Sequence, residues 1–224
     1  MKKFNWQLLF FCSLILLTPW FWRLLLANQT ITFFVCLVSV LLFYFNRFKK
    51  GQLLLLVCFF LLLGMQLVGV ERRDLLSLDN DQQRVQQMRL GEYPPIRIGQ
   101  VWIPLAHWLE GRSETILFYR IKQNVFELID PNLYFFANHP RERAGMDEFE
   151  KLPFFFFPLF VFGFLSELGK KGLGYYFLFL ILPVLLLSVW GNIGRLGPFC
   201  LFPFLMISIF DGCWFLAKKI CSRA

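Results

Sequence analysis

Six long apolar stretches constrain the fold of this chain more than any other feature of its sequence. A membrane-spanning helix needs roughly 17 to 25 mostly apolar residues, because the hydrocarbon layer is about 30 Å thick and each residue rises about 1.5 Å. Such stretches cover residues 4–26, 30–45, 52–70, 153–168, 173–190 and 197–217. Residues 53–63 are apolar on every side, whereas a helix of a soluble core shows one apolar stripe. The sequence therefore predicts an all-α fold, a polytopic membrane helix bundle with six transmembrane helices.

The charged residues are concentrated in one polar insert. Residues 71–152 hold 13 acidic and 11 basic side chains, although the whole chain has only 15 acidic and 23 basic ones. We therefore expect residues 1–70 to form transmembrane helices 1–3 and residues 153–224 to form helices 4–6 with a cytoplasmic tail. Residues 71–152 are expected to form a small helical cap outside the cytoplasm. The 57% hydrophobic content excludes disorder and an ordinary soluble domain.

The basic residues predict the orientation, since Lys and Arg beside short loops stay on the cytoplasmic side. With six spans, ten basic residues fall on one side, namely Lys2, Lys3, Arg47, Lys49, Lys50, Lys170, Lys171, Lys218, Lys219 and Arg223. The opposite short connections carry only Arg23 and Arg195. Both termini are therefore predicted to be cytoplasmic, in a plasma membrane. The net charge of +8 belongs to the membrane flanks, which argues against a nucleic-acid partner and for the lipid bilayer.

The insert shows three helical patterns. Asp79 and Gln82 begin one that runs to residue 90, a second has apolar residues at helical spacing over 98–109, and Ser113 begins a third over 113–128. Aromatic side chains around them suit a layer at the membrane surface. These are Trp102, Trp108, Tyr134, Phe135 and Phe136.

The stretch 134–143 is the most suggestive for binding. It places His139, Arg141 and Arg143 just before the chain re-enters the membrane, and Arg23 and Arg195 are expected on the same side. Guanidinium groups match phosphate oxygens and an imidazole transfers protons near neutral pH. We expect these arginines to bind a lipid phosphate or another phosphate-bearing head group. The alternative is that they pair with acidic neighbours and only anchor the loop.

The acidic residues of the insert suggest a second chemistry. Asp130, Glu142 and Asp147, with His139, are candidate acids and bases for glycosyl transfer. His107 and Glu110 share a helix face, but two ligands do not make a metal site, so neither a metal nor a cofactor is expected. Nucleotide-binding loops and hydrolase signatures are absent from the sequence.

Two acids and one glycine stand out within the apolar stretches. Asp211 lies inside the last stretch, where a carboxylate must face protein or water, so it marks either a functional position or a helix contact. Glu167 is expected to pair with Lys170 or Lys171 at the membrane surface. Gly163 permits a close helix contact.

Three functions are compatible with these features. The first is a non-enzymatic component of a membrane assembly or envelope pathway, whose cap binds a lipid head group or a partner protein. The second is an enzyme, or an enzyme subunit, acting on polyprenyl-phosphate-linked sugars at the outer face. The third is a transporter, although the apolar stretches hold few polar residues.

Overall fold

The structure, a computed structural model, describes residues 2–48, 50–77, 80–92, 96–98, 101–103, 112–136, 149–168 and 173–221. The described part is mostly helical, with one short hairpin and the loops that join the elements. Its elements are α1 (Lys2–Leu16), α2 (Pro19–Ala27), α3 (Gln29–Phe48), α4 (Gln52–Val68), α5 (Asn80–Glu92), β1 (Ile96–Ile98), β2 (Val101–Ile103), α7 (Ser113–Ile129), α8 (Asn132–Phe135), α9 (Phe156–Leu168), α10 (Leu173–Trp190), the 3₁₀ turn η1 (Phe199–Leu201) and α11 (Phe202–Cys221).

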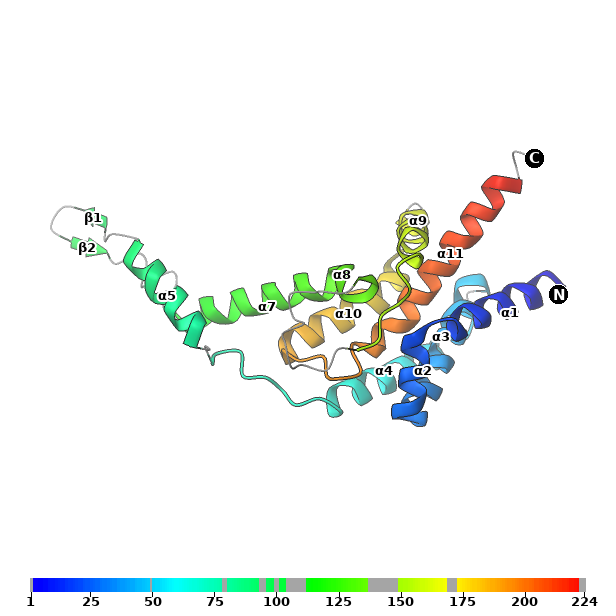
Figure 1. Cartoon of the computed structure of the whole chain (residues 1–224), viewed down its shortest axis with the longest axis horizontal. Helices are drawn as coiled ribbons and strands as arrows, with labels where there is room; N and C mark the ends of the chain where they lie inside the picture. The colour runs from blue at the N-terminus through cyan, green and yellow to red at the C-terminus, as the bar shows by residue number, and fades with distance from the viewer. Residues whose placement is uncertain are drawn as a thin grey trace.

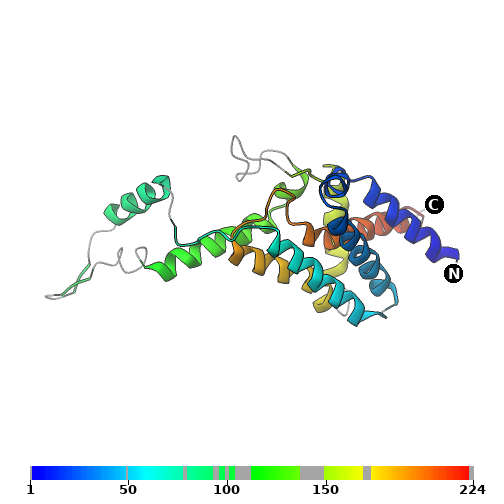
Figure 2. The same ribbon diagram turned by 90° about the horizontal axis from the view of Figure 1, so that it is seen from below.

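The apolar helices form one bundle around α11. All side chains from 199 to 211 are buried, and α11 packs against α1, α3, α9 and α10. Helix α5 and the β1–β2 hairpin lie away from the bundle as an arm that α7 connects to it (Figures 1 and 2). The molecule therefore has a compact helical body and one long projection.

The number of clear membrane spans is smaller than the six that the apolar stretches predict. Helix α3 and the segment Phe199–Lys219 are long and apolar enough to cross a membrane, and α1 with α2 makes a third if the bent pair is one span. Shorter apolar helices cover Gln52–Val68, Phe156–Leu168 and Tyr176–Trp190. Among the described residues, two to three helices therefore meet the length and composition of a span, which is compatible with a membrane location.

The first predicted stretch is not one straight helix. Helices α1 and α2 meet at an angle of 72° at Thr18 and Pro19. Proline has no N–H for the helix and forces the preceding residue out of the helical conformation, and Thr18 is extended, with φ −89° and ψ 126°. The Thr18 hydroxyl donates to the Ile15 carbonyl oxygen at 2.7 Å, so the bend has its own hydrogen bond.

Two of the three helices expected in the insert are present. Helices α5 and α7 confirm the patterns that begin at residues 79 and 113. The helix expected over 98–109 is wrong where the structure describes it, because β1 and β2 pair antiparallel with Ile98 opposite Val101. Branched Ile and Val side chains at alternate positions favour this hairpin over a helix. Residues 104–111 lie outside the described residues.

A glycine pair allows the closest helix contact of the bundle. A Cβ atom on Gly163 of α9 would overlap the Ser208 carbonyl oxygen of α11, and one on Gly212 would overlap the Leu159 carbonyl oxygen of α9. The two backbones therefore touch, as the sequence predicts for Gly163. Small residues permit such contacts between helices in membranes.

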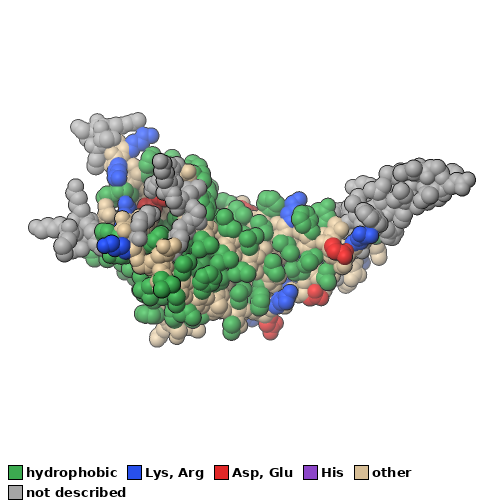
Figure 3. Space-filling model, turned by 180° about the vertical axis from the view of Figure 1, so that it is seen from behind, with side chains coloured by type: hydrophobic (Ala, Val, Ile, Leu, Met, Phe, Trp, Pro, Cys, Tyr) green, Lys and Arg blue, Asp and Glu red, His purple; other side chains and the backbone are tan. Residues whose placement is uncertain are grey.

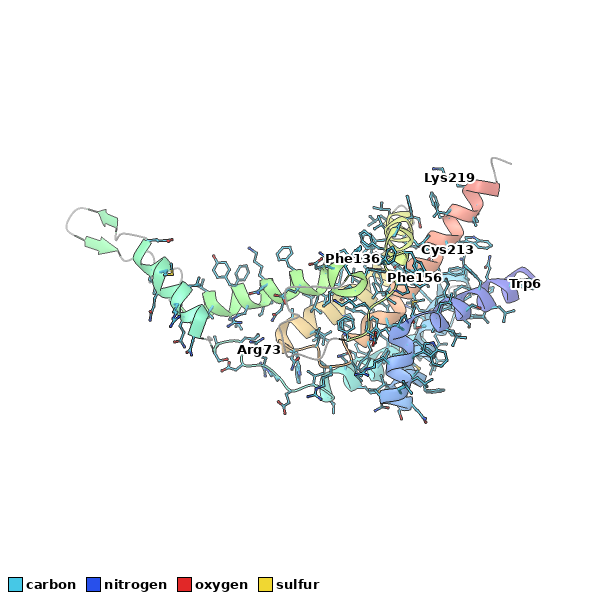
Figure 4. The ribbon with its side chains drawn as sticks, in the orientation of Figure 1. Trp6, Arg73, Phe136, Phe156, Cys213 and Lys219 are labelled. Carbon is cyan, nitrogen blue, oxygen red and sulfur yellow. The ribbon has the colours of Figure 1, made fainter. Side chains whose placement is uncertain are left out.

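The bundle has two ends, one at the termini and one formed by loops. The terminal end holds both chain termini and the α3–α4 turn, and the loop end is formed by segments 69–77, 130–136, 149–152 and 191–198. Figure 4 shows Trp6 and Lys219 at the terminal end and Arg73 at the loop end. Hydrophobic side chains cover the middle of the face in Figure 3, and charged side chains gather towards its two sides.

Candidate functional site at the loop end of the bundle

Trp20 is the buried centre of the loop end. Its indole is fully buried, and the indole N–H donates to the Leu196 carbonyl oxygen at 2.8 Å. The ring packs against Phe149, with centroids 5.1 Å apart, and against Phe202, with centroids 5.4 Å apart. One side chain of α2 therefore joins the 191–198 loop, the segment before α9 and the start of α11.

Gln66 of α4 holds the same loop from the other side. It is fully buried, and its amide N–H group donates to the carbonyl oxygens of Ile193 at 3.1 Å and Gly197 at 3.2 Å. Its amide oxygen accepts from the Cys200 N–H at 3.4 Å. This amide satisfies backbone groups that water cannot reach, which explains a polar side chain in an apolar helix.

Replacing Gln66 with leucine is expected to lower the free energy of unfolding by about 2 kcal/mol, because buried backbone groups lose their partners. The measurement is the thermal midpoint of the purified protein in detergent. The control is Gln52→Leu, which removes an exposed amide from the first turn of the same helix. Equal midpoints for the two variants would show that Gln66 does not hold the loop.

Three glycines shape the 191–198 loop. Gly191, Gly194 and Gly197 have φ values of +75°, +72° and +71°, a conformation that other residues rarely adopt. A Cβ atom would lie 2.7 Å from Leu75 Cδ2 at Gly191 and 2.7 Å from Val70 Cγ2 at Gly194. The loop is thus wedged against segment 69–77, and it carries Asn192 and Arg195 exposed on its surface.

Segment 69–77 is bound to the end of α10 by several hydrogen bonds. The Trp190 indole N–H donates to the Val70 carbonyl oxygen at 2.9 Å, and the Arg73 N–H donates to the Trp190 carbonyl oxygen at 3.1 Å. The Arg72 guanidinium lies 5.9 Å from the centroid of the Trp190 ring. The Asn192 amide donates to the Glu71 carbonyl oxygen at 3.3 Å. These bonds place two exposed arginines beside the loop that carries Arg195.

The structure brings together the elements of two predicted site residues. Arg23 and Arg195 are both exposed. Their segments are joined by the hydrogen bond from Trp20, three positions before Arg23, to Leu196, the residue after Arg195. Asp130 is half-buried and accepts from the Asn132 N–H at 2.9 Å, so it links α7 to α8. The other predicted residues lie outside the described residues. They are His107, Glu110, His139, Arg141, Glu142, Arg143 and Asp147.

Two of the three aromatic residues at 134–136 are buried, whereas the sequence predicts all three at the membrane surface. Tyr134 and Phe135 are buried, and only Phe136 is exposed. The Tyr134 hydroxyl donates to the Leu128 carbonyl oxygen at 2.6 Å, and burial raises the pKa of this hydroxyl well above its ordinary value. Tyr134 therefore belongs to the core under the loop end.

Burial also lowers the pKa of Lys151, whose ammonium donates to the Phe136 carbonyl oxygen at 2.7 Å.

Asp211 lies at the terminal end, away from these residues. Its carboxylate is 3.5 Å from the Arg47 guanidinium and accepts from the Asn46 amide at 3.2 Å. The guanidinium also lies over the rings of Phe210, at 5.4 Å, and Phe43, at 5.8 Å. The structure thus explains Asp211 as a contact between α3 and α11.

Glu167 is more deeply buried than a surface ion pair requires, with 4% of its side chain exposed. It lies on α9 in electrostatic range of Tyr176, whose hydroxyl is hydrogen-bonded to that of Ser208. The expected partners Lys170 and Lys171 lie outside the described residues. Glu167 therefore belongs to a buried polar group between α9, α10 and α11.

Sequence reasoning missed Gln66, Arg72 and Arg73. Gln66 had a signal, because an amide in a long apolar stretch needs a buried partner. The two arginines seemed to be part of a long loop, and their position beside Arg195 comes from bonds across the chain. In the part of the chain that the structure describes, no three His, Cys, Asp or Glu side chains are grouped to hold a metal ion.

Comparisons with models of protein families, with curated proteins and with solved structures found no match to this chain.

Proposed function

We propose that the chain is a multi-pass protein of the plasma membrane, with six crossings and both termini in the cytoplasm. The exposed apolar side chains of the shorter helices support this proposal, since a water-soluble surface does not carry them at this density. Helix α4 exposes Leu53, Leu54, Val57, Phe60 and Leu61, and α10 exposes Ile181, Leu185 and Val189. Helix α9 is about 20 Å long, so this crossing requires local thinning of the bilayer.

Cysteine labelling tests the orientation. In a variant without the native cysteines, a cysteine in place of Ser113 at the start of α7 is expected to react in intact cells with a thiol reagent that cannot cross membranes. A cysteine in place of Lys50, in the α3–α4 turn, is the control and should react only after permeabilisation. The reverse pattern would invert the topology.

We infer that the loop end binds a phosphate-bearing lipid head group. The observation that carries this is the set of exposed arginines on segments that hydrogen bonds join to one another. They are Arg23, Arg72, Arg73 and Arg195. Two acidic residues, Glu71 and Asp74, lie in the same segments as the four arginines, so the net charge of these six side chains is positive.

The chemistry of these side chains suits the phosphate of a lipid head group. Guanidinium groups donate paired hydrogen bonds to phosphate oxygens, and the loop glycines with Gln66 hold Arg195 on a fixed backbone. The role is binding and placing a lipid for a membrane assembly, without chemistry on it. Arg141 and Arg143, which precede Phe149 in the chain, are expected to add to the same site.

Binding to the purified protein in a neutral detergent tests this role. The probe is a fluorescent short-chain phosphatidylglycerol, followed by fluorescence polarisation, with farnesyl phosphate and inorganic phosphate as competitors. Arg195→Gln and Arg72→Gln are each expected to weaken binding at least about tenfold, since a charge-assisted hydrogen bond contributes roughly 1.5–3 kcal/mol. Lys50→Gln, at the terminal end, is the control and should bind like the parent.

The competitors identify the phosphate source. Displacement by farnesyl phosphate alone indicates a polyprenyl-linked head group, and displacement by inorganic phosphate indicates a site for free phosphate. Equal binding by the arginine variants and by the Lys50 control would refute the proposal.

The enzyme alternative requires a carboxylate that acts on the bound head group. If Asp130→Asn, Glu142→Gln and Asp147→Asn each preserve cellular activity while Arg141 and Arg143 are required, the enzyme alternative fails. Asp130 already has a local role between α7 and α8, so a loss for Asp130→Asn counts only if the variant keeps its thermal midpoint.

A further inference from the structure

Helix α7 has three faces of different chemistry. Ile121, Asn124, Val125 and Leu128 are half-buried or buried, and the Asn124 amide donates to the Ser188 carbonyl oxygen of α10 at 2.9 Å. Gln123 and Glu127 lie one turn apart on a second face, with the Gln123 amide donating to the Glu127 carboxylate at 2.8 Å. This second face is polar.

The third face is apolar and exposed. Phe118 and Phe126 are both 64% exposed, Tyr119 is 51% exposed and Ile129 is 52% exposed. With 3.6 residues per turn, residues 118, 119, 122, 126 and 129 fall on one side of the helix. Exposing this face to water is unfavourable, because it carries three aromatic rings.

The only charged group on that face is suited to a lipid surface. Lys122 lies within the apolar row, and its ammonium is 5.9 Å from the centroid of the Tyr119 ring. A lysine extends its long chain along an apolar surface while its charge reaches polar groups, and lipid phosphates supply such groups. The charge of Lys122 therefore complements the head groups.

Helix α7 packs against α10, a helix that also exposes apolar side chains. The bond between Asn124 and Ser188 fixes α7 against the last turns of α10, whose exposed side chains are Ile181, Leu185 and Val189. Figures 1 and 2 both show α7 beside α10 and reaching from the loop end towards the arm. A bilayer that surrounds α10 therefore meets α7 at the lipid–water boundary.

We propose that α7 is an interfacial membrane helix, with Phe118, Tyr119, Phe126 and Ile129 inserted at the boundary between head groups and acyl chains. Gln123, which is exposed, then faces water, and α5 with the hairpin is held at a fixed height above the membrane. This inference rests on the proposed membrane embedding of the bundle and does not require the arginine site.

Spin labels in lipid vesicles test the proposal. Single cysteines replace Phe126, Ile129, Gln123 or Leu185 in the full chain without native cysteines, in vesicles of phosphatidylcholine and phosphatidylglycerol. The ratio of collisions with oxygen to collisions with a water-soluble nickel chelate is expected to be at least about fivefold higher at 126 and 129 than at 123, since interfacial helices bury their apolar face about 5–10 Å deep.

The label at Leu185 on α10 separates the two proposals. If it meets nickel as readily as the label at Gln123, the membrane embedding itself fails. If it meets oxygen alone but labels at 126 and 129 meet nickel, only the interfacial helix is wrong. Labels at 126 and 129 that meet neither reagent would show that protein covers this face, which also overturns the proposal.

Discussion

Replacing Gly163 with alanine is expected to destabilise the protein by at least about 3 kcal/mol, the upper end of the usual cost of overpacking. The added Cβ atom would overlap the Ser208 carbonyl oxygen and lie 2.8 Å from the Gly212 nitrogen. These are backbone atoms of a rigid helix, so relief requires α9 and α11 to separate. The measurement is the thermal midpoint in detergent, with size-exclusion chromatography to detect unfolded protein.

Gly64→Ala is the matched control, because a Cβ atom there meets no heavy atom within 4 Å and α4 is helical at that position. Alanine is favoured over glycine inside a helix by about 0.8–1 kcal/mol, so this variant should be as stable as the parent or more stable. Gly212→Ala should reproduce the loss from the other helix. A Gly163→Ala variant as stable as the Gly64→Ala variant would contradict the close contact.

Replacing Arg47 with methionine is expected to cost about 3 kcal/mol, because it removes the cation of a carboxylate that is only 5% exposed. Changing Asp211 to leucine as well should restore much of the loss, since a buried ion pair and an apolar pair of similar size differ little in stability. The measurement is the unfolding free energy of the parent, the two single variants and the double variant.

Lys218→Met is the control for this cycle. It removes a cation that lies 5.8 Å from the centroid of the Trp214 ring at the same end, and its lysine is exposed. Exposed contacts of this kind contribute about 1 kcal/mol or less. Additive losses for Arg47→Met and Asp211→Leu would show that the pair does not stabilise the contact between α3 and α11.

Local sequence patterns predicted the individual helices of this fold better than they predicted which helices pack together. Helix α5 was predicted from its flanking residues and helix α7 from its apolar spacing. The bend before α2 was missed, because the apolar count alone favours one straight span although Pro19 disfavours a helical conformation at Thr18. The hairpin was missed because Ile98, Val101 and Trp102 also fit helical spacing over a short window. Short apolar runs do not distinguish the two.

The partners of the buried polar residues could not be predicted from the sequence, because they lie in distant parts of the chain. Asp211 was recognised as unusual, but its cation, Arg47, lies 164 positions earlier. Gln66 is 127 positions from Ile193, to which it donates. The loop-end arginines come together through Trp20 and Trp190 rather than through a motif. Periodicity reports which side of a helix is apolar and does not report which helix will cover it.

The close contact between α9 and α11 has a consequence for synthesis. Helix α9 is short and carries the buried Glu167, and its main neighbour α11 is made later in the chain. While the nascent chain is still on the ribosome, α9 has neither the glycine surface of α11 nor the Ser208 region beside it. Helix α9 therefore lacks its packing surface until the C-terminal helix has been made, and a chain truncated before Phe202 would leave Gly163 and Glu167 uncovered.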